Sequence, residues 1–127
     1  MIRLNRREFD ALVAKAVSLL PEQFRAHMEN LSIEVYPRPT REMLDEDGFE
    51  PDDEQELMGL YVGVPLTEKS VNATYEWPEQ IYLFQENIQA VCDTPGQVVK
   101  EIRATVLHEI AHHFGFDDDE LDKMGLG

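Results

Sequence analysis

The chain has 127 residues, the usual size of one domain and enough to bury a single core. Its formal net charge of -15 would repel a phosphate backbone or an anionic membrane surface, which argues against nucleic acid and membrane as partners. Cys92 is the only cysteine, so no intramolecular disulfide can form, and the sequence has neither a signal-peptide pattern nor a long apolar run. We therefore expect one domain over residues 1–127 in a reducing compartment, most simply the cytoplasm.

The first predicted helix begins after Asn5, a residue type that often caps helices. Apolar residues then recur at three- and four-residue spacing, as on one face of an amphipathic helix: Phe9, Leu12, Val13, Ala16, Leu19 and Leu20. Pro21 either ends this helix or opens a second short helix that reaches Met28.

Three short segments have the pattern of β-strands. Residues 31–37 (LSIEVYP) alternate apolar and polar side chains, which is the period of a half-buried strand. Residues 57–64 (LMGLYVGV) and 80–85 (QIYLFQ) look like two more strands bounded by Pro and Gly. Together with the helices, these strands predict an α+β fold.

Residues 42–56 contain nine acidic side chains and no basic one, together with a Gly and a Pro. Such a run is typical of a solvated or mobile loop. It does not fit a calcium-binding EF-hand, because with Asp45 in the first position the required Gly falls fourth and Phe49 takes a ligand position. A lid or a segment that docks a partner is the alternative interpretation.

A last helix is predicted from Thr94 to Gly115. Thr94, Pro95 and Gln97 match a capping box with Pro at the first helical position, and Gly115 is placed to end the helix. At about 100° per residue, one side of this helix carries the predicted core residues Val99, Val106, Ile110 and Phe114, with Ile102 and Leu107 on its flanks.

His108 and His112 lie one above the other on the opposite side of this helix. Neutral imidazole is a good zinc ligand, and two histidines four residues apart on a helix converge on one point. Glu109 is a quarter-turn away, where it could touch a metal-bound water as a general base, and H-E-x-x-H on a helix is the signature of such zinc hydrolases. The spacing therefore predicts a zinc site.

Catalytic zinc usually has three protein ligands. Asp118 lies three residues after Gly115, at the place where H-E-x-x-H-x-x-G-x-x-H enzymes have a third histidine. Alternatively, Asp117 or Asp118 caps a last short helix, DELDKM. His113 is expected to be structural rather than a ligand, and His27 to be a surface residue.

Residues 108–121, HEIAHHFGFDDDEL, fit the pattern HExxHxxGxxD and resemble the minimal zincin family of predicted bacterial zinc-dependent metallopeptidases. The likeness extends to the N-terminal amphipathic helix and to the central segment GLYVGVPLTEKS, residues 59–70. The resemblance implies a single zincin-like α+β domain with a small mixed sheet of three to four strands and a C-terminal zinc-binding helix. It also implies that His108, His112 and Asp118 are the zinc ligands and that Glu109 is the catalytic base.

The predicted function is zinc-dependent hydrolysis of a peptide bond in a peptide or protein substrate. By analogy with larger zincins, the substrate could lie beside an edge strand, which the sequence suggests is residues 80–85. A non-catalytic zinc-stabilised interaction module is the main alternative. A zinc-dependent ribonuclease is less favoured, because its related motif lacks the Glu and because the chain is acidic. Glu101 and Thr105 are on the same side of the predicted helix as His108. They either support the metal ligands from behind or line the pocket, or they are plain solvated residues. The sequence leaves the oligomeric state open.

Overall fold

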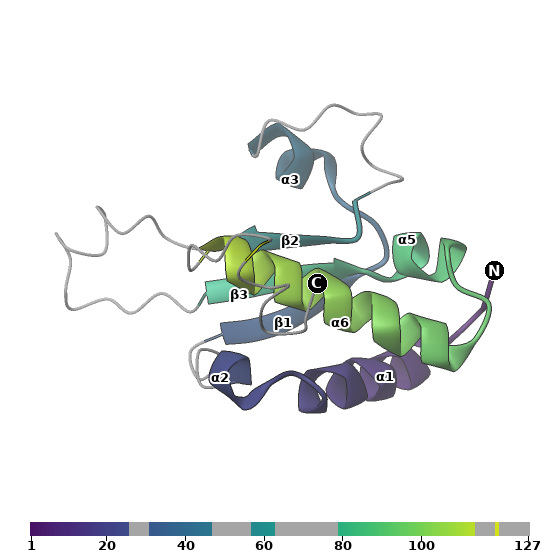
Figure 1. Ribbon diagram of the computed structural model, residues 1–127. Coiled ribbons are helices and arrows are strands. Elements are labelled where there is room, and N and C mark those ends of the chain that lie inside the picture. The colour runs from purple at the N-terminus through teal and green to yellow at the C-terminus, as the bar shows by residue number, and fades with distance from the viewer. Residues whose placement is uncertain (26–30, 47–56, 63–78, 114–118, 120–127) are drawn as a thin grey trace, which may run out of the picture.

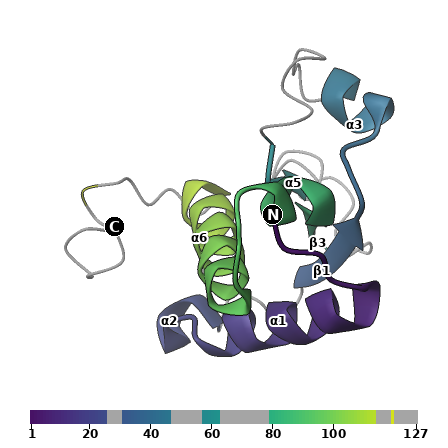
Figure 2. The ribbon, with the colours of Figure 1, turned by 90° about the vertical axis from the view of Figure 1, so that its right-hand side faces the viewer.

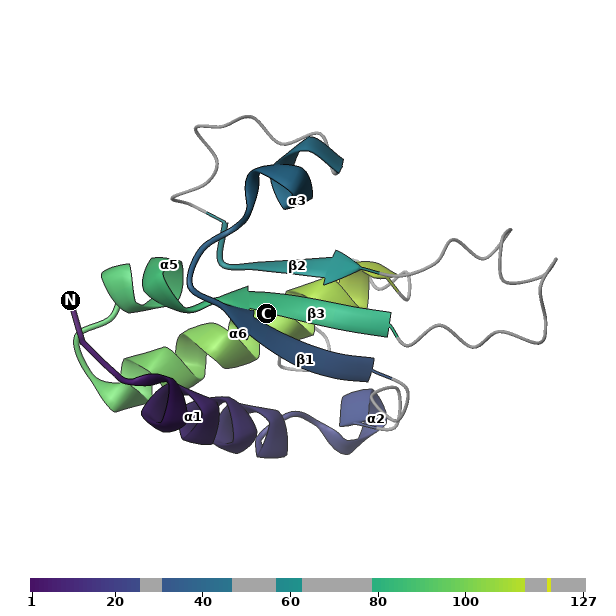
Figure 3. The same ribbon diagram turned by 180° about the vertical axis from the view of Figure 1, so that it is seen from behind.

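Two helices pack with a small β-sheet to form the core of the protein. The computed structural model describes residues 1–25, 31–46, 57–62, 79–113 and 119. Helix α6 (Pro95–His113) crosses one face of the sheet, and α1 (Arg6–Ser18) packs against α6 (Figures 1 and 2). In the view from behind, the strands lie in front of α6 (Figure 3).

The sheet that the described residues form has three strands in the order β1-β3-β2. Strand β1 (Leu31–Tyr36) is parallel to β3 (Glu79–Phe84), whereas β2 (Gly59–Val62) is antiparallel to β3. The predicted α+β fold with a small mixed sheet is therefore confirmed. The predicted strand at residues 57–64 is shorter within the described residues, and positions 63 and 64 lie outside them.

The prediction that residues 80–85 form an edge strand is wrong. β3 occupies the middle of the sheet, where it hydrogen-bonds to β1 on one side and to β2 on the other. Its Ile81, Leu83 and Phe84 are fully buried, as expected for a central strand, and Gln85 already belongs to the following helix, α5 (Gln85–Ala90). Among the described strands, β1 and β2 are the edges.

The register of the three strands separates two faces of the sheet. Ile33 is opposite Ile81, which is opposite Tyr61, and in the next such row Val35, Leu83 and Gly59 are aligned. Because side chains alternate along a strand, these two rows face the same side, the side that α6 covers. The buried residues on this side of the sheet join those of α1 and α6 in one apolar core that includes Phe9, Val13, Ile81, Leu83, Val98, Ile102 and Ile110.

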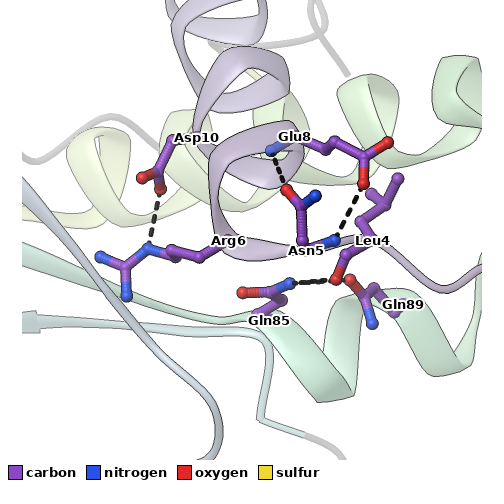
Figure 4. Close-up of polar contacts among 7 residues, drawn as sticks. All are labelled: Leu4, Asn5, Arg6, Glu8, Asp10, Gln85 and Gln89. Atoms are coloured by element: carbon purple, nitrogen blue, oxygen red, sulfur yellow. Dashed lines mark hydrogen bonds and ion pairs between the residues drawn. The ribbon is translucent and has the colours of Figure 1, made fainter.

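Helix α1 starts where the sequence predicts. The Asn5 side chain accepts a hydrogen bond from the Glu8 backbone N–H at 2.7 Å, and the Glu8 carboxylate accepts one from the Asn5 N–H at 3.1 Å (Figure 4). Gln85 of α5 donates to the Leu4 carbonyl oxygen at 3.1 Å, which ties this start to the end of β3. The beginning of α1 is thus held both locally and by a distant part of the chain.

The predicted apolar face of α1 is correct except at its end. Phe9, Val13, Ala16 and Leu20 are buried, but Leu19 is 51% exposed. The helix ends at Ser18, so Leu19 no longer follows the helical period that would have placed it in the core. The short helix α2 (Glu22–Arg25) follows Pro21, so this proline precedes a second helix, and the predicted continuation to Met28 lies outside the described residues.

The acidic segment starts as a helix and not as a loop. Helix α3 spans Arg41–Glu46. The Thr40 hydroxyl oxygen accepts a hydrogen bond from the Met43 N–H at 3.2 Å, and Leu44 is buried, so a cap and one apolar anchor outweigh the acidic composition there. The rest of the predicted loop, residues 47–56, lies outside the described residues.

Helix α5 fixes the chain just before β2. The Asn87 side-chain amide is buried and donates to the Leu57 carbonyl oxygen at 2.7 Å, and the Phe84 N–H donates to the Met58 carbonyl oxygen at 3.0 Å. These bonds set the position from which β2 starts.

In the described part of the chain, no helix has the length and apolar character needed to cross a membrane.

Replacing the cap of α1 should destabilise the fold. Asn5→Ala removes the acceptor of the Glu8 N–H, and loss of an N-cap typically costs about 1 kcal/mol. Chemical denaturation measures this change, and Asn5→Asp, which keeps an acceptor oxygen, is the control. Equal stability of the Asn5→Ala and wild-type proteins would mean that the cap does not contribute.

Candidate metal centre

Helix α6 carries the predicted zinc motif, and its start is capped. The Thr94 hydroxyl oxygen accepts a hydrogen bond from the Gln97 N–H at 3.2 Å, as a capping box predicts. The return bond differs, because the Gln97 side-chain oxygen accepts from the Asp93 N–H at 2.6 Å and not from Thr94. The helix begins at Pro95 as expected and is described as far as His113.

One side of α6 is embedded in the core. Val99, Ile102, Val106, Leu107 and Ile110 are buried, as the helical period predicts. Val98 and Ala111 are buried as well and were not included in the predicted face. Phe114, the remaining predicted core residue, lies outside the described residues. This burial leaves one stripe of the helix surface unburied, and side chains that take part in a site must lie on that stripe.

His108 lies on that stripe and is exposed, whereas the neighbouring Glu109 is half-buried. The imidazole of His108 lies opposite the core, so the packing of the core does not require it. His112 occupies the expected helical position one turn later, and its backbone is part of α6. The stripe thus presents the predicted spacing of the motif on a continuous helix.

The third predicted ligand, Asp118, lies outside the described residues, as do Asp117 and Gly115. No group of three His, Cys, Asp or Glu that could hold a metal occurs among the described residues. The set of His108, His112 and Asp118 therefore stays a prediction. Its chemistry suits zinc, because two imidazoles and one carboxylate are a common catalytic zinc donor set, and the exposed position of His108 fits that role.

Strand β2 lies directly beside the motif stripe. A Cβ atom added to Gly59 would be 2.5 Å from Cγ2 of Thr105 and 3.0 Å from the Tyr82 carbonyl oxygen. His108 and Glu109 follow Thr105 by three and four residues, the spacings that put side chains on one helix face. The edge strand and the candidate site are therefore neighbours. The sequence signalled this approach only by an isolated glycine within a strand pattern.

Thr105 does not offer its hydroxyl to the site. Its Oγ1 donates to the Glu101 carbonyl oxygen at 2.8 Å, one turn earlier in α6. The side chain is half-buried and its methyl group faces β2. Of the two roles that the stripe suggested for Thr105, that of a plain solvated residue is wrong, because the side chain packs against the edge strand. Its place behind the site stays a prediction.

Cys92 is not suited to bind zinc. Its side chain is buried, and burial raises the pKa of the thiol, with further increases from the nearby Glu101 and Asp93 charges. A cysteine ligates metals as the thiolate, which these effects disfavour. The donors for the site must come from elsewhere.

A family model for zincin-like metallopeptidases matches residues 28–127. The chain belongs to the zincin-like metallopeptidase family. At the level of the family, this membership supports a zinc-dependent hydrolase that acts on peptide bonds. The resemblance expected from the motif is thus confirmed.

Among solved structures, the chain is similar to a conserved hypothetical protein from T. thermophilus. The two are 21% identical, with a TM-score of 0.54, and the match covers 87% of this chain and 94% of the other. This likeness shows a shared fold. No curated protein matches the chain.

The buried thiol should resist alkylation. Because the pKa of Cys92 is raised, the reactive thiolate is populated only at more alkaline pH, and burial restricts access as well. We expect iodoacetamide in mildly alkaline buffer to label the native protein far more slowly than the urea-unfolded protein, as followed by intact mass. Equal labelling rates would contradict the buried position of this thiol.

The predicted ligands can be tested by metal content. Wild-type protein purified without added metal should hold zinc in a one-to-one ratio by mass spectrometry, because the predicted ligands His108, His112 and Asp118 would form a complete donor set. His108→Ala and His112→Ala should lose the metal, and Asp118→Ala should bind it more weakly. Asp119→Ala, which changes an exposed neighbour, is the control. Full zinc content in Asp118→Ala would identify Asp118 as a helix cap.

Proposed function

We propose that this protein is a zinc-dependent peptidase in which Glu109 is the general base. The observation that carries the proposal is the helix α6, whose buried face leaves His108 and Glu109 on the side next to an edge strand. Membership of the zincin-like metallopeptidase family supports the same reaction class. His108, His112 and Asp118 would hold the metal.

When bound, zinc supplies a Lewis acid that makes water a better nucleophile near neutral pH and that polarises the substrate carbonyl. Glu109 accepts the proton of the attacking water and returns it to the leaving amine. Its half-buried position is suited to this task, because a carboxylate that is partly shielded from solvent is held in place beside the reacting groups.

The substrate is proposed to bind as an extended peptide along the edge of β2 that faces away from β3, which has no strand partner among the described residues. Backbone N–H and C=O groups on an unpaired edge can pair with a peptide strand. β2 replaces residues 80–85 in this role, because β3 already has strand partners on both sides. The position of β2 beside Thr105 brings this edge close to the residues that perform the chemistry.

The length of β2 suits this arrangement. β2 and α6 run in the same general direction (Figures 1 and 3). From Gly59 to Val62 the strand advances about 10 Å, and from Thr105 to His112 the helix advances about the same distance. A peptide paired with β2 would therefore pass the part of the motif that lies on α6, from His108 to His112.

The expected setting is a reducing compartment such as the cytoplasm, in agreement with a single buried cysteine. The net charge of -15 favours peptides over nucleic acid as substrates, because the surface repels phosphate.

Glu109→Gln tests the proposed reaction. The amide cannot accept the proton of water, so the variant should retain zinc and lose at least about a hundredfold in kcat. The assay is cleavage of a library of internally quenched fluorescent peptides, with metal content measured on the same samples. Glu34→Gln, the same change at an exposed position of β1, is the matched control. Full activity in Glu109→Gln would show that another residue is the base.

A further inference from the structure

The close approach of β2 to α6 takes place at one pair of residues. At Gly59 there is no room for a Cβ atom, since it would be 2.5 Å from the Thr105 methyl carbon and 3.0 Å from a backbone oxygen of β3. Gly59 is itself buried. The strand therefore lies as close to the helix as a glycine allows and no closer.

The Thr105 methyl group cannot easily turn away from this contact. β-Branched side chains in helices have few accessible χ1 rotamers, and Thr can be held in one of them by a hydrogen bond to the preceding turn. Thr105 makes that bond to the Glu101 carbonyl oxygen at 2.8 Å. Its methyl group is thus held in a fixed position against β2.

The other side of the contact is also restrained. The chain before Gly59 is held by hydrogen bonds to the Leu57 and Met58 carbonyl oxygens, and Gly59 itself pairs with Leu83 in the central strand. The Thr105 methyl group cannot rotate away and the backbone at Gly59 cannot rearrange locally. The size of these two residues therefore determines the distance between β2 and α6.

We propose that Gly59 and Thr105 are positioning residues that set the distance from the substrate-binding edge of β2 to His108 and Glu109. This inference rests on the proposed function. A peptide paired with β2 moves with that strand, so its scissile bond is placed correctly only when β2 is at the right distance from α6. A displacement of about 1 Å at the reacting atoms can lower a rate about a hundredfold.

The two kinetic constants should respond differently. Gly59→Ala pushes β2 away from α6 but leaves the outer edge of the strand, on the side away from β3, intact, so the peptide still pairs with it. We expect kcat to fall about ten- to a hundredfold while KM changes less than about threefold. Zinc content should not change, because the variant does not touch the predicted ligands.

A second substitution should restore the activity. Thr105→Ser removes the methyl group and keeps the hydroxyl that bonds to Glu101, so it creates the room that alanine at position 59 needs. Gly59→Ala/Thr105→Ser should regain most of the lost kcat, limited by the remaining contact with the Tyr82 carbonyl oxygen. Thr105→Ser alone introduces no clash, and by loosening the contact it should lower kcat about threefold.

Gly96→Ala is the matched control. It is the same change at a glycine in the first turn of α6. The added Cβ there meets only the Thr94 hydroxyl oxygen at 3.9 Å, an ordinary contact. Its kinetics should equal those of the wild type.

The experiment measures kcat and KM for the best-cleaved quenched peptide, at a temperature where thermal unfolding shows each variant to be fully folded. Zinc content and binding of the same peptide to each variant in the inactive Glu109→Gln background provide readouts without turnover. A zinc-loaded Gly59→Ala protein with wild-type kcat would overturn the inference, as would a double variant no better than Gly59→Ala. If Gly59→Ala does not fold, an unchanged kcat in Thr105→Ser has the same meaning. A wild-type protein that cleaves no peptide would refute the proposed function and this inference together.

Discussion

The burial of one face of α6 is the constraint on which the rest of the structure depends. Its apolar side packs on α1 and on the sheet in a single core. Because a helix repeats every 3.6 residues, burying Val99, Val106 and Ile110 necessarily turns His108 outward. The packing that stabilises the fold therefore also orients the residue that the proposed metal site needs.

Local sequence patterns made the two long helices, α1 and α6, predictable. The cap at Asn5, the start of α6 after Thr94 and the buried face of α6 all follow from local patterns, and the structure confirms them. The errors occur where a neighbour distant in sequence decides the outcome. The apolar run in residues 80–85 indicates a strand against a core, but it contains no information on how many strands lie beside it.

The acidic segment and Leu19 are two other places where the sequence pattern did not predict the structure. Composition predicted a loop after Thr40, yet one hydroxyl cap and the burial of Leu44 are enough for a short helix. Leu19 fits the apolar period of α1, but the helix stops one residue earlier. The candidate site shows it too: the motif could be found from spacing, whereas the contact between Gly59 and Thr105 joins segments far apart in the sequence and needs the fold to be seen.

The parallel pairing of β1 with β3 has a consequence for the order of folding. Ile33 and Ile81 are aligned across this pair, so a long stretch of chain must be looped out before the pairing can form. During synthesis, α1 and β1 emerge first and have no partner until β3 and α6 follow. Phe9 and Val13 then stay exposed to solvent until the helix with the histidines is made. The element that completes the core is the one that carries two of the three proposed zinc ligands, His108 and His112, so a nascent chain completes its core and gains these ligands in the same step.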